Sequence, residues 1–230
     1  MRPVVYLLPG LLCDEAVWRA QSEILSRTHD VRVPHFFGFS SLPGMARSVL
    51  AAAPDRFALA GHSMGGRVAL EIMRLAPERV ERIALLNTGI HDVRPGEVER
   101  RQVLVDIAYT KGMEALAAAW APPMVAPGRV DDAVLMAEIT AMVRRATPQI
   151  YAGQIRALLN RPAVRDLLGE IRCLASVIGA RQDGWSPLAQ HEEIASLIPG
   201  ARLTCIEDCG HMSPMEKPGA VTEALSNWLA

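Results

Sequence analysis

Net charge, cysteine and long hydrophobic runs are all scarce in this sequence. Lys and Arg number 24 against 25 Asp and Glu, which gives a formal net charge of −1. A dedicated nucleic-acid-binding protein needs a basic face, so this balance argues against nucleic acid as a partner. No apolar run reaches the roughly 18 residues that indicate a transmembrane helix, and we therefore expect no membrane span.

The few cysteines also exclude a disulfide scaffold and a metal centre. Cys13, Cys173, Cys205 and Cys209 show neither CxxC spacing nor a dense framework, and we interpret them as reduced thiols of a cytosolic protein. No cluster of His, Cys and Asp has the spacing of metal ligands. We therefore expect no metal and no cofactor.

The amino terminus resembles a signal peptide only superficially. Arg2 precedes the apolar stretch 3–12, but Pro9-Gly10 interrupts that stretch and no small-x-small cleavage site follows. A buried first strand is the better interpretation, and we expect a cytoplasmic location.

The composition is that of a globular chain with a large core. Half of the 230 residues are hydrophobic, which excludes global disorder. A chain of this size forms one domain, or one domain with a large insertion.

Two parts of the chain alternate short apolar runs with helical patterns, which predicts βαβ units and a parallel sheet covered on both faces. The expected strands are 4–8, 31–33, 57–60, 83–86, 174–179 and 202–206. The expected helices between them are 14–26, 45–53, 64–75, 187–197 and 218–229.

The alternation stops between the two parts, where no good strand is found. Helical patterns cover 97–109, 113–120, 130–145 and 149–159. We therefore predict an α/β core made of residues 1–90 and 171–230, with a helical insertion at 91–170.

The segment Gly61-His62-Ser63-Met64-Gly65-Gly66 follows a predicted strand and opens a predicted helix. A serine on so sharp a turn presents its hydroxyl at the end of the sheet. Side chains at Gly61 and Gly65 would collide with the neighbouring strand or helix. G-x-S-x-G also arises by chance, so this context and suitable partners have to support the interpretation of Ser63 as a nucleophile.

A serine nucleophile needs a base, and that base needs a carboxylate. His211 follows the last predicted strand, at the sheet end where α/β proteins place their chemistry. Asp183 follows the preceding strand and lies between Ser63 and His211 in chain order. Asp92 and Asp208 remain as alternatives for the acid, and Asp183 could also be a turn residue.

Acyl transfer further requires two backbone N–H donors for the developing oxyanion. We predict Met64, directly after the serine, and Leu11 in the loop after the first strand, with Leu12 as the alternative to Leu11.

These motifs resemble those of the α/β-hydrolase superfamily, over the whole chain. Gly210-His211 followed by Glu216-Lys217-Pro218 looks like the G-H-x(4)-E-x-P pattern of that family, in which the glutamate is structural; Ser213-x-x-Glu216 also fits a helix capping box. The resemblance to small esterases and lactonases implies a three-layer α/β-hydrolase core with a helical cap. The family usually has His-Gly where this chain has Pro9-Gly10, and it usually begins with further strands. We therefore predict a shortened, all-parallel sheet of six strands.

The predicted function is that of a serine hydrolase acting on a small or medium carboxylic ester, thioester or lactone. The alternatives are a C–C bond hydrolase, lyase or perhydrolase on the same triad, or a ligand-sensing protein that keeps the fold. The expected substrate pocket is apolar, with lining residues Leu12, Phe36, Phe37, Trp120, Trp185 and Met212.

Arginine is abundant in the insertion. The residues are Arg94, Arg100, Arg101, Arg144, Arg145, Arg156, Arg161 and Arg165. Such a set is usually a solvated surface, but it also suggests an anionic substrate or an acidic carrier protein as partner. Arg144 and Arg145 are adjacent in the sequence and are the first positions at which to test this idea.

Overall fold

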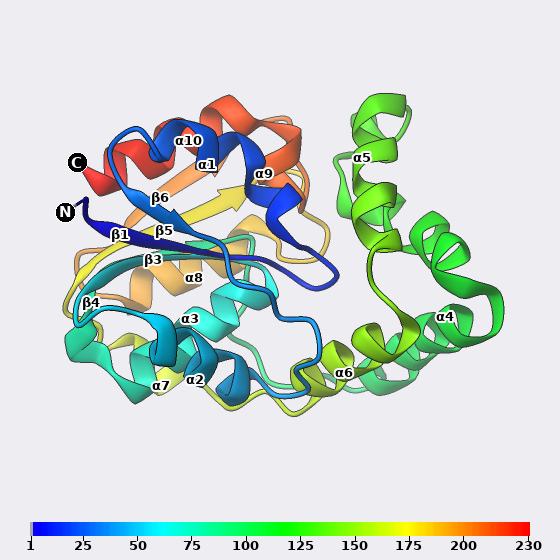
Figure 1. The fold of residues 1–230 in the computed structure, drawn as a ribbon, viewed down its shortest axis with the longest axis horizontal. Helices are drawn as coiled ribbons and strands as arrows, with labels where there is room; N and C mark the ends of the chain where they lie inside the picture. The colour runs from blue at the N-terminus through cyan, green and yellow to red at the C-terminus, as the bar shows by residue number, and fades with distance from the viewer. Residues whose placement is uncertain (1) are drawn as a thin grey trace.

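The computed structural model describes residues 2–230 and contains a six-stranded, all-parallel sheet of order β2-β1-β3-β4-β5-β6 (Figure 1). The strands are β1 (Val4–Leu8), β2 (Asp30–Arg32), β3 (Phe57–His62), β4 (Val80–Leu86), β5 (Leu174–Ala180) and β6 (Arg202–Ile206). The predicted shortened sheet is therefore confirmed.

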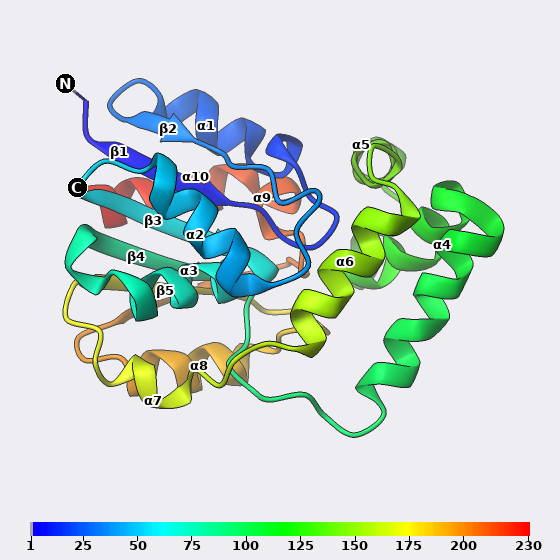
Figure 2. The same cartoon turned by 60° about the horizontal axis from the view of Figure 1, so that its bottom comes forward.

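Helices cover the two faces of the sheet in separate layers (Figure 1, Figure 2). One layer holds α1 (Arg19–Leu25), α9 (Ser213–Glu216) and α10 (Pro218–Leu229). The other holds α2 (Leu42–Ala52), α3 (Met64–Leu75), α7 (Arg165–Leu168) and α8 (Leu188–Leu197).

The side-chain alternation of β1 explains this three-layer arrangement. Val5 and Leu7 belong to the core that includes Trp18 and Trp228, whereas Tyr6 and Leu8 belong to the core on the opposite face. Successive strand residues point to opposite faces, so a strand that is apolar throughout has to be covered on both sides.

A helical insertion joins β4 to β5 and lies beside the carboxyl ends of the strands (Figure 1). It contains α4 (Glu97–Trp120), α5 (Ala133–Arg144) and α6 (Pro148–Leu159). The two helical patterns expected at 97–109 and 113–120 form one bent element, because Gly112 adopts a non-helical φ of 83° between them.

Several predicted boundaries differ from the structure. The expected helix 14–26 consists of a 3-10 turn, Glu15–Trp18, followed by α1, and the Asp14 side chain caps the turn. The helix expected from 130 begins only at Ala133, where the Asp132 side chain accepts from the N–H of Leu135. Short polar side chains cap helices by binding these free N–H groups, and in both places they determine the first residue.

Two structural findings bear on the composition argument. None of the four cysteines forms a disulfide within residues 2–230. The same residues include no helix that is both long enough and apolar enough to cross a bilayer.

Candidate active site

Ser63 lies on a strained turn between β3 and α3. Its φ of 55° is in the left-handed region, which non-glycine residues rarely adopt. The backbone N–H of Ser63 donates to the Leu86 carbonyl at 2.8 Å, so β4 holds the turn in place. A Cβ at Gly61 would lie 2.3 Å from the Gly65 carbonyl oxygen, and one at Gly65 would lie 2.2 Å from that of Leu8. Both glycines are therefore required, as the sequence indicates.

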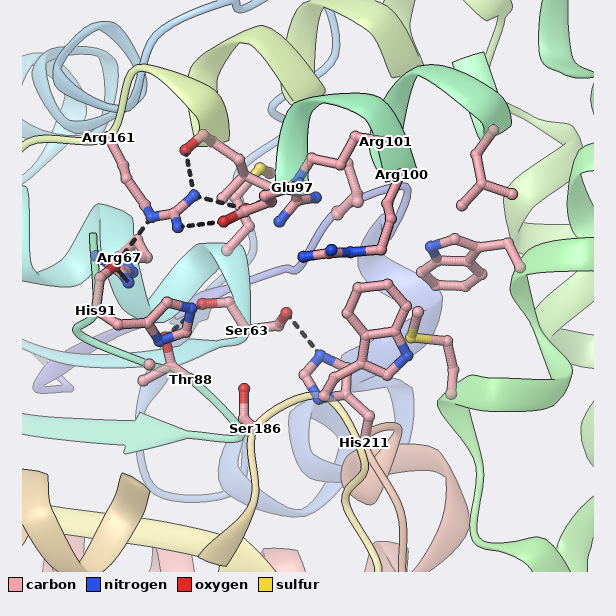
Figure 3. A pocket seen from close by; sticks show the side chains of 18 of the residues that line it. Ser63, Arg67, Thr88, His91, Glu97, Arg100, Arg101, Arg161, Ser186 and His211 are labelled. Carbon is pink, nitrogen blue, oxygen red and sulfur yellow. Dashed lines mark hydrogen bonds and ion pairs between the residues drawn. The ribbon is translucent and has the colours of Figure 1, made fainter. Parts of the chain in front are cut away.

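The structure brings together the three side chains predicted to act as a triad. His211 Nε2 lies 2.8 Å from Ser63 Oγ, and His211 Nδ1 lies 2.8 Å from Asp183 Oδ2 (Figure 3). The residues come from the loops after β3, β5 and β6. Because all strands are parallel, these loops meet at one edge of the sheet.

All the surroundings of Asp183 favour its charged form except burial. Oδ1 accepts the N–H groups of Trp185 and Ser186, each at 2.8 Å, and Oδ2 accepts from Asn87 as well as His211. Burial alone would raise the pKa of this carboxyl, but the charge and hydrogen bond of His211, with the other donors, hold the pKa below its usual value. The side chain is thus an anion that orients the imidazole.

Asn87 is a site residue that sequence reasoning missed. It follows β4 with a φ of 46°, donates to Asp183 Oδ2 at 2.9 Å and accepts a 2.5 Å hydrogen bond from Ser213 Oγ. Only its place at the carboxyl end of a parallel strand could have indicated it. The alternative acids do not take this position: the Asp92 side chain is exposed, and Asp208 adopts a left-handed φ in the loop before His211.

Two backbone donors predicted for the oxyanion lie beside Ser63. The N–H groups of Leu11 and Met64 donate no hydrogen bond within residues 2–230, and both residues line the same cavity as Ser63. The N–H of Leu12, the alternative donor, is already bonded to Gln154 Oε1 at 2.9 Å. A Cβ at Gly10 would lie 3.2 Å from the Ser63 Cβ, so glycine permits this close approach.

His62 supports the base without facing the cavity. Its Nε2–H donates to the His211 carbonyl at 2.8 Å. Burial, with the neighbouring His211 as a smaller cause, lowers the pKa of His62 to about 3, so the ring is neutral.

This neutral ring makes stability depend on pH. The unfolded chain protonates His62 below about pH 6.5, whereas the folded protein does so only near pH 3. Acidification from pH 6.5 therefore lowers the free energy of unfolding, with His62 contributing up to about 1.4 kcal/mol per pH unit. His62→Gln, which keeps a donor for the His211 carbonyl, should reduce this slope in urea unfolding between pH 7 and 5. A slope equal to that of the wild type would contradict the buried neutral state.

Glu216 ties the insertion to the loop of His211. Its carboxylate accepts the backbone N–H groups of Ala126, Gly210 and Met212 at 2.8–3.1 Å. Ser213 and Glu216 do not form the capping box that the sequence allows, because the Ser213 hydroxyl donates to Asn87 instead. Glu216 therefore fixes the loop of His211 in position relative to the insertion.

We expect Glu216→Gln to destabilise the protein by about 1–3 kcal/mol, because an amide NH2 then faces backbone donors in a buried site. Thermal unfolding measures this. Glu223→Gln, on exposed α10 surface, serves as the matched control. Equal unfolding temperatures for the two variants would contradict the structural role of Glu216.

A cavity of about 340 Å³ opens above Ser63. Of the predicted pocket residues, Trp120 and Trp185 line it, together with the oxyanion-loop residues Leu11 and Met64. The remaining predicted lining residues lie outside it. Leu12, Phe36 and Met212 are buried in the core, and Phe37 packs against the core. The actual apolar wall includes side chains from the insertion that the sequence did not single out, such as Met124 and Tyr151.

The arginines of the insertion divide into two groups. Arg94, Arg100, Arg101 and Arg161 line the cavity, where Arg67 of α3 joins them. Those outside it are Arg144, Arg145, Arg156 and Arg165. Arg144 pairs with Glu114 at 3.0 Å, and Arg145 pairs with Asp14. Arg144 and Arg145, the first positions at which to test an anionic partner, thus lie outside the cavity and are each paired with a carboxylate.

Comparisons with known proteins agree with this geometry. A family model described as "Alpha/beta hydrolase family" matches residues 5–224. The pimeloyl-(acyl-carrier protein) methyl ester esterase of Aromatoleum aromaticum is 28% identical, with 94% of each chain covered.

Two solved structures superimpose on nearly the whole chain. One is a thermophilic esterase from Thermogutta terrifontis with malate bound, at a TM-score of 0.89 and 26% identity, covering 99% of this chain and 89% of its own. The other is an enol-lactonase from Burkholderia xenovorans LB400, also at 0.89 and 26%, covering 100% and 92%.

Proposed function

Because this chain belongs to the alpha/beta hydrolase family, we propose that it is a serine hydrolase of small or medium carboxylic esters, thioesters or lactones. The proposal depends chiefly on one observation, the unbroken hydrogen-bonded series from Ser63 through His211 to Asp183. Its esterase and lactonase relatives support the same reaction class.

In the first step His211 Nε2 takes the proton of Ser63 Oγ as that oxygen attacks the substrate carbonyl. Asp183 stabilises the imidazolium that results. The N–H groups of Leu11 and Met64 bind the oxyanion, and the amino-terminal end of α3 adds its positive dipole.

His211 then returns the proton to the leaving alcohol or thiol, and an acyl-enzyme remains on Ser63. Water enters, loses a proton to His211 and attacks the acyl carbonyl. Collapse of this second tetrahedral intermediate releases the acid and restores the serine hydroxyl.

We further propose that an acidic carrier protein presents the acyl group to the enzyme. The name of the Aromatoleum relative supports this proposal, because that name mentions an acyl carrier protein. Arg94 is exposed where it lines the cavity and suits contact with an acidic surface. A methyl ester of an acyl group on carrier protein should then be hydrolysed faster than the same ester on a short pantetheine fragment.

The reaction class is tested with p-nitrophenyl esters from acetate to octanoate. We expect turnover, with an initial release of p-nitrophenol equal to the enzyme concentration wherever deacylation is the slower step. An absence of turnover over the whole series would favour C–C bond cleavage, lyase or perhydrolase chemistry, or ligand sensing.

A further inference from the structure

The cavity above Ser63 is far more basic than the protein as a whole. Five arginines and one glutamate line it, although the whole chain has a formal net charge of −1. A cavity built only for a neutral ester has no need of such a wall, because guanidinium groups are costly to remove from water.

Two of these arginines have a structural task. Arg161 holds the Glu97 carboxylate through two hydrogen bonds of 2.7 and 2.8 Å, and Arg101 adds a third at 2.9 Å (Figure 3). Burial alone would raise the pKa of Glu97, but these partners lower it to about 2. Within residues 2–230, Glu97 therefore forms its ion pairs with these two arginines and none with the other three that line the cavity.

Arg67 is a buried cation without a carboxylate partner. It lies on α3, one turn after Ser63, and its side chain is almost wholly buried. Nη2 donates to the His91 carbonyl at 2.6 Å, whereas Nη1 has no hydrogen-bond partner within residues 2–230. A buried charge without a counter-ion is costly, and an anion in the cavity that Arg67 lines would reduce that cost.

Arg100 is the second cation without a carboxylate. It forms no ion pair within the described part of the chain. Figure 3 shows its guanidinium extending from α4 into the space above Ser63. A planar guanidinium presents paired N–H donors that match the two oxygens of a carboxylate.

We propose that the substrate carries a free carboxylate in addition to its scissile carbonyl, and that Arg100 binds this carboxylate while the charge of Arg67 favours an anion in the same cavity. This inference rests on the proposed hydrolase function and names its substrate class. The volume of about 340 Å³ suits such a small molecule. Glu97, held by Arg161 and Arg101, is an example in the same cavity of a carboxylate bound by guanidinium groups.

A matched pair of substrates tests the proposal. p-Nitrophenyl pentanoate and the p-nitrophenyl monoester of glutaric acid differ only in that a carboxylate replaces the terminal methyl group. We expect the wild type to prefer the anionic ester by about tenfold or more in kcat/KM. Arg100→Ala should reduce the ratio of anionic to neutral kcat/KM by about 10- to 100-fold, as for a lost charged hydrogen bond.

Arg156→Ala is the control, because Arg156 is an exposed arginine of α6 outside the cavity. It should leave the ratio at the wild-type value. A wild-type preference for the neutral ester, or an Arg100→Ala variant with an unchanged ratio, would overturn the proposal.

Binding of glutarate to the wild type, measured by calorimetry, separates this inference from the proposed reaction. Glutarate should bind, and Arg100→Ala should weaken that binding by at least tenfold, whether or not esters are turned over. Arg67→Met, checked for an intact fold by circular dichroism, should weaken it as well. An affinity for glutarate that Arg100→Ala leaves unaltered would overturn the assignment of Arg100.

Discussion

Replacing Ser63 with alanine should lower kcat/KM for a small ester by about 10⁴- to 10⁶-fold. In the proposed mechanism the hydroxyl forms the covalent bond to the acyl group, and no other side chain is hydrogen-bonded to His211 Nε2 within residues 2–230. The rate that remains should come from the oxyanion donors and substrate binding alone. Substrate hydrolysis at several enzyme concentrations measures the effect.

Ser186→Ala is the matched control for this variant. Ser186 places a second hydroxyl in the same cavity, but its side chain makes no hydrogen bond within the described residues. We expect a change of less than about threefold. If Ser63→Ala kept the wild-type rate, the hydroxyl at position 63 would not be the nucleophile.

Asp183→Asn should lower kcat by about 10³- to 10⁴-fold while the protein stays folded. Both carboxylate oxygens accept N–H donors, so the new NH2 group meets a donor in either orientation. The imidazole then loses the acceptor that holds Nδ1–H and directs Nε2 toward Ser63. Steady-state kinetics and thermal unfolding together distinguish this loss from misfolding.

Asp92→Asn and Asp208→Asn are the comparisons, because the sequence left both residues open as the acid. Within residues 2–230 neither side chain is hydrogen-bonded to His211, and each variant should retain activity within about threefold of the wild type. A loss at either position as large as that at Asp183 would mean that the acid has been assigned to the wrong residue.

Much of the fold could be predicted because its signals are local. The helix at 64–75, the strand at 202–206 and the helix at 218–229 have the predicted bounds. Their periodicity and flanking prolines are contained in a few adjacent residues. The six-stranded parallel sheet then follows from the spacing of the elements.

The contacts that were missed join residues far apart in the sequence. His191 lies beside two glutamates in the sequence, yet it is buried, and its Nε2 accepts from the N–H of Thr88. Glu216 similarly bonds Ala126, 90 positions away. No local pattern carries such contacts, so only the folded arrangement identifies them.

The predicted pocket lining differs from the observed cavity for a related reason. Leu12 follows a predicted oxyanion residue in sequence, but its side chain is buried in the core. Its backbone has a left-handed φ of 61°, and its N–H donates to Gln154. Arg67 was not singled out as a cavity residue, because the helical pattern of the sequence identifies only which side of α3 is buried. Which buried residues face a cavity depends on how the insertion packs against the core.

Covalent labelling tests the central claim most directly. A fluorophosphonate probe reacts with a serine whose proton is taken by a neighbouring base, and mass spectrometry of the digested protein locates the adduct. We predict one adduct, on the peptide that contains Ser63, which is lost in His211→Ala. Labelling at another residue, or undiminished labelling of Ser63 without His211, would contradict the account.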